Sequence, residues 1–270
     1  EIGDRYGEAR ALEALARILK CQSHHQRAYE TQLSSLRIRR DIGDPNSIGQ
    51  ALNLLARYAI DLGRLEEARK HAEESLGIHR ATGDQRSESA TLQCLARLHR
   101  KLGALGEAIV YARKSLVIRR DIGDRQGESE SLDAIARTYL HMGYYEQALQ
   151  HTKRALAVQR RIDDFFGQGW SLDHLGRICL MSGEPGRAVR HFEQALVVRR
   201  RIRDRYGQGR TLGRLAAVYL QMGRTDDAVA AAERALAIER ESTEPGGSSE
   251  RVTELARLVE RARSAGVEHR

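Results

Sequence analysis

The chain has 270 residues, of which 30% are charged and 5% are aromatic, and it contains only three prolines. This length exceeds the usual size of a single hydrophobic core, so the sequence encodes either two domains or an array of repeats. The scarcity of Pro favours a mostly helical protein, and no apolar run is long enough to predict a membrane span. The net charge of +8 indicates anionic partners only weakly, because acidic residues are interleaved throughout.

The three cysteines, Cys21, Cys94 and Cys179, are odd in number and show no CxxC spacing. This pattern argues against a disulfide framework and against a zinc site. It predicts a cytoplasmic protein whose thiols are small core side chains. The first residues, 1–4, carry no signal-peptide pattern.

The sequence repeats with a period of 40 residues, which indicates a repeat architecture. Four columns recur without exception in six copies: Asp4, Asp44, Asp84, Asp124, Asp164 and Asp204; Leu12, Leu52, Leu92, Leu132, Leu172 and Leu212; Ala28, Ala68, Ala108, Ala148, Ala188 and Ala228; and Leu36, Leu76, Leu116, Leu156, Leu196 and Leu236. The copies are predicted to fill residues 1–242, with starts near 3, 43, 83, 123, 163 and 203.

Each copy is predicted to form two helices, A and B. The Asp column suits an N-cap, and Pro45 after Asp44 suits the first helical position. Gly43 suits the left-handed residue that ends the previous helix. A second Gly column, which includes Gly63, marks the turn inside the copy, and Ser23 replaces it in the first copy. Because neither helix can bury its apolar face alone, the copies must stack.

Helix B of each copy runs to a basic end, such as Arg39–Arg40 or Arg119–Arg120, where cations stabilise the helix dipole. After the sixth copy, residues 243–248 have the composition of a linker. Residues 249–270 are predicted to form an amphipathic capping helix and a tail. Because residues 1–4 match residues 41–44, we expect the chain to begin inside a longer protein.

The repeat resembles the tetratricopeptide (TPR) family, whose signature is present as Leu132, Ile135, Ala136, Tyr139, Gly143 and Ala148. The resemblance covers residues 3 to 242 and implies an all-α fold, a right-handed superhelical solenoid of six antiparallel helix pairs plus a C-terminal capping helix. The 40-residue length is similar to a subtype found in LGN-like scaffolds and in bacterial signalling regulators with a nucleotide-binding switch. The Asn common in LGN-like repeats is replaced, for example by Ala14, so the sequence does not predict an LGN-like ligand.

No catalytic motif is present, and neither an enzyme nor a cofactor is predicted. His71, His151 and His191 share one helix B column, which raises the question of a metal site. Packed neighbouring helices lie roughly 8 to 10 Å apart, whereas zinc ligands bond at about 2 Å. These histidines therefore cannot share an ion, and no metal site is predicted.

The main candidate for function is an Arg column on helix A: Arg17, Arg57, Arg97, Arg137 and Arg177. The resemblance places this face in the concave groove of the array, where guanidinium groups suit carboxylates or phosphates of a partner. The alternative is local pairing, because Glu13, Asp133 and Asp173 each precede one of these arginines by four residues.

The fifth copy differs from the others. Phe165 and Phe166 open it, and Trp170 lies on one face of helix A with His174 and Arg177. The next helix A carries Arg210 and Arg214 in the columns of Trp170 and His174. An aromatic residue beside several arginines is typical of a binding hot spot. The alternative is that Trp170 fills a gap between copies.

A second basic feature surrounds Asp204: Arg199, Arg200, Arg201, Arg203 and Arg205. Pairing with neighbouring acids explains part of it, and nucleic-acid binding is the weaker alternative because phosphate-tracking surfaces show denser basic clusters.

The sequence thus predicts a protein-protein interaction module, the sensor or scaffold part of a larger signalling protein. Its expected partner is a protein or peptide segment with acidic and apolar residues, in trans or from its own parent chain, and not a membrane. The predicted groove residues are Arg57, Arg97, Asp133, Arg137, Trp170, His174, Arg177, Arg210 and Arg214. The alternatives are nucleic-acid or other polyanion binding along the Arg199–Arg205 edge and self-association through the first copy.

Overall fold

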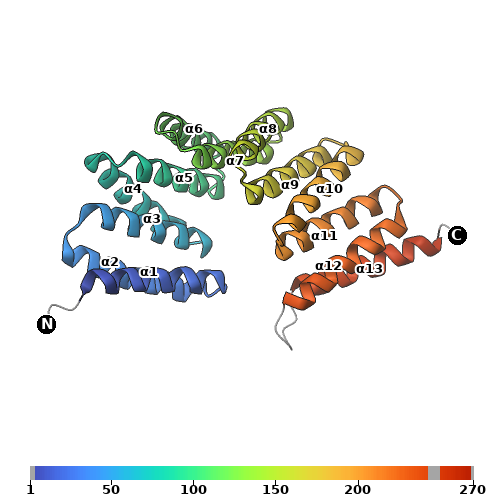
Figure 1. Cartoon of the computed structure of the whole chain (residues 1–270), viewed down its shortest axis with the longest axis horizontal. Coiled ribbons are helices and arrows are strands. Elements are labelled where there is room, and N and C mark those ends of the chain that lie inside the picture. Colours follow the sequence, from blue (N-terminus) through green and yellow to red (C-terminus); the bar gives the residue numbers. More distant parts are fainter. Residues whose placement is uncertain (1–3, 243–249, 269–270) are drawn as a thin grey trace. The chain divides into compact units, whose positions relative to one another are not determined.

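The computed structural model describes residues 4–242 and 250–268, and in these residues every regular element is a helix (Figure 1). Helix A of the copies is observed as α1 (Arg5–Cys21), α3 (Pro45–Asp61), α5 (Gln85–Lys101), α7 (Arg125–His141), α9 (Phe165–Met181) and α11 (Arg205–Gln221). Helix B is observed as α2 (His25–Ile42), α4 (Leu65–Thr82), α6 (Leu105–Asp121), α8 (Tyr145–Arg161), α10 (Pro185–Arg201) and α12 (Thr225–Ser242). The last helix is α13 (Glu250–Glu268). The predicted linker, residues 243–248, lies outside the described residues.

The helices form two compact units: unit 1 spans residues 1–142 and contains α1–α7, and unit 2 spans residues 143–270 and contains α8–α13. Within each unit every helix packs against the next helix in the chain, and neighbouring A helices also touch, as α3 touches α5 and α9 touches α11. This packing confirms the predicted all-α array of helix pairs. None of the helices in the described part of the chain has the length and hydropathy that a membrane crossing requires.

The predicted caps are confirmed. The Asp before each A helix of the six copies accepts hydrogen bonds from N–H groups of the first turn. Asp124, for example, accepts from Gly127 N at 2.9 Å. Glycines in both turn columns have positive φ. Three non-glycine residues adopt the same left-handed conformation, namely Ser23 at φ 63°, Asp163 at φ 52° and Arg203 at φ 55°.

The core of unit 1 is formed by the A-helix leucines and the small residues that face them. Leu52, Leu55 and Leu95 are buried together with Ala56. The first copy differs, because Leu15 is 46% exposed whereas its equivalent Leu55 is fully buried. The α1 face is therefore an exposed apolar surface, and it is the surface on which the self-association alternative depends.

The core of unit 2 contains a large aromatic ring where the neighbouring copies have small side chains. Phe192 of α10 is fully buried, and a Cβ atom on Gly176 of α9 would lie 2.6 Å from this ring. Neighbouring copies have Ala at the position of Gly176. The missing methyl group at Gly176 thus makes room for Phe192.

The C-terminal helix α13 packs as a seventh helix A. It packs against α12 and also touches α11, just as α5 packs against α4 and touches α3. The 40-residue period explains this packing, because Leu255 falls in the column of Leu15 and Arg257 in the column of Arg17. Leu255 is buried in the core of unit 2.

Candidate interaction site

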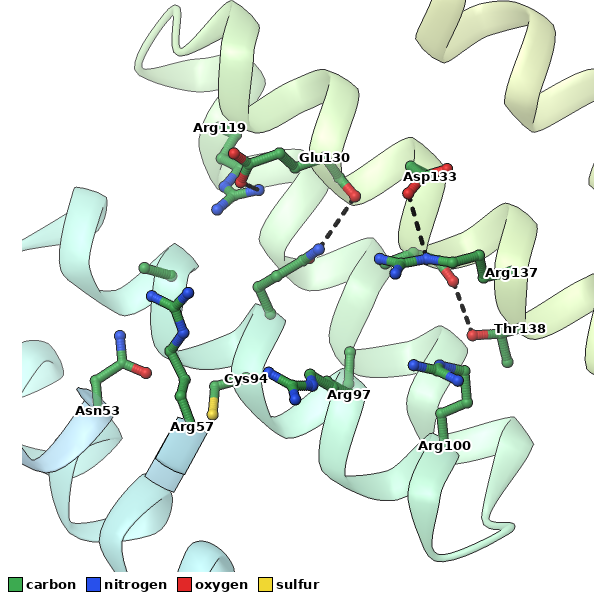
Figure 2. A pocket seen from close by; sticks show the side chains of 14 residues that line it. Asn53, Arg57, Cys94, Arg97, Arg100, Arg119, Glu130, Asp133, Arg137 and Thr138 are labelled. Carbon is green, nitrogen blue, oxygen red and sulfur yellow. Dashed lines mark hydrogen bonds and ion pairs between the residues drawn. The ribbon is translucent and has the colours of Figure 1, made fainter. Parts of the chain in front are cut away.

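In unit 1 the A helices carry a pocket of about 460 Å³ rich in arginine. Figure 2 shows the guanidinium groups of Arg57, Arg97, Arg100 and Arg137 along this pocket, with that of Arg97 between those of Arg57 and Arg100. Arg57, Arg97 and Arg137 hold equivalent positions on α3, α5 and α7, so the repeat itself aligns them. Arg100 follows Arg97 by one helical turn and therefore lies on the same face of α5.

Acidic side chains neutralise some of these arginines. Arg137 Nε lies 3.2 Å from Asp133 Oδ2, and Arg119 of α6 lies 3.3 Å from Glu130. Arg97 forms an ion pair with Asp61, which also binds Lys20 at 3.1 Å. These contacts leave part of the positive charge of the pocket unmatched.

Two of the pocket arginines have no carboxylate partner within residues 4–242 and 250–268. Arg57 forms neither a hydrogen bond nor an ion pair there, and the Arg100 guanidinium lies 3.5 Å from His141 Nε2. Burial lowers the pKa of Arg100, and the nearby charges of Arg137 and Arg97 lower it further. The pocket therefore holds cations that repel one another and would be stabilised by an anion.

The Cys94 thiol lies in the wall of the pocket and is not a nucleophile. Burial raises the pKa of Cys94 to about 12, although Arg57 and Arg97 oppose the change. Only the thiolate is reactive. Cys94 and Cys179 are buried, as expected from the sequence, whereas Cys21 is exposed, and the expectation of a core thiol was wrong for that residue. Among the described residues, no group of three or more His, Cys, Asp and Glu side chains could hold a metal ion.

In unit 2 the corresponding faces of α9 and α11 carry a stack of aromatic and cationic groups. The Trp170 ring lies 6.4 Å from the Phe166 ring and 6.2 Å from the His174 ring. The guanidinium of Arg210 lies over Trp170 at 5.0 Å, and that of Arg199 lies over it at 5.2 Å. Trp170 is thus partly covered by its own unit.

The carboxylate of Asp173 is fully buried and directed to the next helix A. It pairs with Arg214 of α11 and accepts a hydrogen bond from Thr211 Oγ1 at 3.2 Å. From the sequence, Asp173 was instead expected to pair locally with Arg177, which is partly buried on α9.

Glu13 likewise pairs with a residue outside its own turn, since Arg39 Nη2 donates to it at 2.6 Å. Of the three predicted local pairs, only Asp133 with Arg137 is observed as an ion pair within one helix.

The predicted Arg199–Arg205 edge is only partly a surface feature. Arg199 is 1% exposed, and its guanidinium donates to Gly169 O at 3.3 Å, so it does not belong to an exposed edge. Arg201 lies over the Phe165 ring at 4.1 Å, and Arg205 pairs with Glu241. Two of the five arginines are exposed and form neither an ion pair nor an aromatic contact in the described part of the chain.

Those two exposed residues are Arg200 and Arg203.

The burial of Arg199 is shared by the equivalent residues of the other copies, which the sequence predicted as cations at the C-terminal ends of the B helices. In each of the first five copies, the side chain at this position turns inward and is buried. The column consists of Arg39, His79, Arg119, Gln159 and Arg199. Its members contact the next helix A; Arg119 Nη1, for example, donates to Gly127 O at 2.7 Å.

A second pocket, of about 590 Å³, lies in unit 2 between α11 and α13. Arg210 and Arg214 line it from α11, and Leu258 and Arg261 line it from α13. From the sequence, α13 was expected to cap the array and was not assigned to a binding face. The arginine at position 257, in the same column as Arg17, was the signal that could have revealed it.

The stacked pairs of helices and the cationic face of the A helices define a helical-repeat protein of the kind that presents an extended binding surface. The chain belongs to the tetratricopeptide repeat family, because the model of that family matches residues 47–121, 87–161, 125–201 and 167–241. No curated protein matches the sequence significantly.

Solved structures with the same fold include a signal transduction ATPase with numerous domains (STAND) from Pyrococcus horikoshii, which has a tetratricopeptide repeat sensor. It matches 96% of this chain with a TM-score of 0.72 at 18% identity, and this chain covers 41% of that protein. A Rap protein in complex with competence and sporulation factor matches 97% of this chain, and 76% of its own length is covered, with a TM-score of 0.71 at 13% identity.

BtubC (BKLC) from P. vanneervenii matches 92% of this chain, and 96% of its own length is covered, with a TM-score of 0.66 at 17% identity. At these identities the likeness shows the fold.

Proposed function

We propose that this chain is a non-catalytic protein-interaction module that binds an acidic segment of a partner on the A-helix face, with the pocket of unit 1 as its main contact. The observation that carries the proposal is the presence of Arg57 and Arg100 in this pocket without carboxylate partners in the described residues. Arginine is the residue best suited to bind carboxylate and phosphate groups with two parallel hydrogen bonds. A partner segment would supply the missing negative charge.

We further propose that the array is the sensor or scaffold part of a larger signalling protein, and that the segment comes from a second protein or from its own parent chain. The fold likeness to a STAND protein, of which this chain covers 41%, supports this proposal. So does the Rap protein bound to competence and sporulation factor, because it shows that an array of this fold can hold a ligand.

In unit 2, Trp170 is the proposed apolar contact, with Arg177 for an acidic group. The ring is held by Phe166 and by the guanidinium of Arg210, which restricts its rotamers before a partner arrives. Rigid aromatic side chains of this kind lose little conformational entropy on binding. Phe166 is 57% exposed beside Trp170 and extends the apolar surface.

A pull-down from a nuclease-treated lysate of the source organism tests the proposal with four versions of the chain. They are the parent sequence, a unit 1 variant with Arg57→Glu and Arg100→Glu, a unit 2 variant with Trp170→Ala and Arg177→Glu, and a control. The control, Arg37→Glu with Arg154→Glu, makes the same charge change as the unit 1 variant at exposed helix B residues that form no ion pair in the described residues. Circular dichroism verifies that each version is folded.

The proposal expects a protein that the parent sequence and the control retain and that the unit 1 variant loses. Loss in the unit 2 variant as well would assign Trp170 and Arg177 to the same partner. Equal retention by all four versions would refute binding on the A-helix face.

The polyanion alternative keeps one supporting observation, which is exposed aromatic rings beside the arginine edge of unit 2. Tyr206 is 59% exposed, and Arg210 lies over its ring at 5.7 Å. Bases stack on such rings while arginines contact phosphates. This alternative expects binding of single-stranded nucleic acid that falls steeply as salt rises and is lost on reversal of Arg200 and Arg203.

A further inference from the structure

The pocket of unit 1 brings together arginines from three consecutive A helices. Arg57 comes from α3, Arg97 and Arg100 come from α5, and Arg137 comes from α7. Their guanidinium groups line one pocket, spread from Arg57 at one side to Arg100 and Arg137 at the other (Figure 2). A ligand in this pocket can therefore accept hydrogen bonds from more than one of these helices.

The charges that line the pocket do not balance. Five arginines line it, because Arg119 joins the four named above, against the two carboxylates Glu130 and Asp133. Each of these carboxylates already has an arginine partner. Arg97 is paired with Asp61, which lies outside the lining.

Arg57 and Arg100 therefore provide two positive charges that form no ion pair with a carboxylate of the described residues, although the nearby Asp133 partly offsets the charge of Arg100. Their nearest neighbours within the pocket include other arginines, which oppose the charge on Arg100. A ligand that carries two negative charges would match these two cations.

A phosphoryl group meets this requirement better than a carboxylate does. A phosphate monoester carries about −1.5 to −2 charges at pH 7 on three acceptor oxygens. These oxygens point in three directions, so donors from α3, α5 and α7 can be bound together, whereas the two oxygens of a carboxylate lie in one plane and share one charge.

We propose that the pocket formed by Arg57, Arg97, Arg100 and Arg137 binds a phosphoryl group. This inference rests on the proposed function, because it names the chemistry that the same face recognises. The phosphoryl group can belong to a phosphorylated side chain of the partner segment or to a free phosphorylated metabolite. Both sources present the same dianion to the arginines.

Isothermal titration calorimetry with matched ligands tests the chemistry. Phenyl phosphate and benzoate share a phenyl ring and differ in the acid, and a phosphoserine peptide is compared with the same peptide carrying Glu instead. The proposal expects each phosphorylated ligand to bind at least about tenfold more tightly than its carboxylate counterpart. Binding should also weaken as the pH falls through about 6, where the phosphate takes up a proton.

Arg57→Gln and Arg100→Gln test the site. Each removes a charge-assisted hydrogen-bond donor, so each should weaken the binding of phenyl phosphate by about tenfold or more. Arg17→Gln is the matched control, since it changes the same column of the same unit on α1, outside the lining of the pocket. Its affinity for phenyl phosphate should equal that of the parent sequence.

Benzoate binding as tightly as phenyl phosphate would overturn the proposal, and so would phenyl phosphate binding that is absent or unaffected by Arg57→Gln. Such a result leaves the proposed function intact if the Arg57 and Arg100 charge reversals still release a protein partner. Adenosine monophosphate separates the two sources. Tighter binding of the phosphoserine peptide indicates a modified protein, and tighter binding of the nucleotide indicates a free metabolite.

Discussion

The third copy, in unit 1, and the fifth copy, in unit 2, hold the same backbone with different pairs of side chains. In the third copy the equivalent positions of helices A and B carry Ala96 and Ala112, both buried. In the fifth they carry Gly176 and Phe192, and the ring occupies the space that a methyl group at Gly176 would need. The period of 40 residues therefore fixes where these two side chains meet and not which residues they are, and the larger ring of the fifth copy needs a glycine opposite it.

The A-helix faces of the two units differ in how their arginines are used. In unit 2, Arg214 is bound to the buried Asp173, and Arg210 lies over Trp170. In unit 1, Arg57 and Arg100 have no carboxylate partner among the described residues. Similar sequence features thus form internal contacts in unit 2 and leave arginine charge without an ion pair in unit 1, and mutations in each unit can test this difference.

The largest effect is expected for the aromatic ring in the core of unit 2. Phe192→Ala removes a fully buried ring and leaves a cavity, so it should lower the free energy of unfolding by about 3–5 kcal/mol. Urea denaturation followed by circular dichroism measures the change. Ala112→Gly at the same column of unit 1 serves as the control, with an expected loss of about 1 kcal/mol from helix propensity.

Because Gly176 and Phe192 share one space, the stability effects of replacing them should not be additive. Gly176→Ala alone should cost about 1–3 kcal/mol because its methyl group meets the Phe192 ring. Combined with Phe192→Ala, the same change should be neutral or stabilising, since it recreates the Ala–Ala pair of the third copy. Additive costs in the double variant would show that the two residues do not share one space.

The next largest effect is expected for the buried carboxylate of unit 2. Asp173→Ala leaves Arg214 without its partner, and since the Arg214 side chain is a quarter exposed, the expected loss is about 2–3 kcal/mol. Asp133 holds the equivalent position in unit 1, where its side chain is 17% exposed and pairs with the 40% exposed Arg137, so Asp133→Ala should cost less, about 1 kcal/mol. Equal losses, measured by urea denaturation, would contradict the distinction between the two faces.

The sequence predicted the elements that depend on local chemistry. Asp caps, left-handed turn residues and the A and B helices are set by neighbouring residues, and all are observed. It did not predict that Asp173 pairs with Arg214. A spacing of four residues shows only that Asp173 and Arg177 can meet within one helix, and it does not show whether an arginine on the next helix A is the better partner. The burial of Arg199 was missed for the same reason.

The composition of the pocket was predicted in part. Arg57, Arg97, Asp133 and Arg137 were assigned to one face from the 40-residue column, and the structure brings them into one pocket. Arg100 was missed because it has no column of its own; its spacing of one turn from Arg97 was the available signal. The relation of this pocket to a ligand remains a proposal.

A smaller, stabilising effect is expected at the turns between copies. Unit 1 has Gly at these turns, for example Gly83 at φ 70°, whereas unit 2 has Arg203 in the same conformation at φ 55°. A residue with a side chain costs about 1–2 kcal/mol in the left-handed conformation. Replacing it by glycine removes this cost, but part of the stabilisation is lost because glycine also makes the unfolded chain more flexible. Arg203→Gly should therefore raise the free energy of unfolding by roughly 0.5–1 kcal/mol. A lower midpoint in urea would contradict this.

The smallest effect at neutral pH is expected where the units differ in one buried, titratable side chain. His79 in unit 1 occupies the buried column that Gln159 occupies in unit 2. Burial lowers the pKa of His79 below its ordinary value of 6.5, although Asp84 and Glu88 oppose the change. The unfolded chain therefore takes up this proton first, so the stability that neutral His79 contributes is complete above about pH 6.5 and is lost as the pH falls toward the folded-state pKa.

His79→Gln should remove that loss and flatten the dependence of stability on pH between 7.5 and 5.5, by up to about 1.4 kcal/mol per pH unit within the window. Urea midpoints at several pH values measure the slope. Gln159→His is the reciprocal variant and should steepen it, because it places an imidazole in the equivalent buried position of unit 2. Some acid sensitivity should persist in His79→Gln, since burial also lowers the pKa of His71, His99 and His191. An unchanged slope in both variants would show that the buried column does not couple to protonation, and would assign the acid loss to the other histidines.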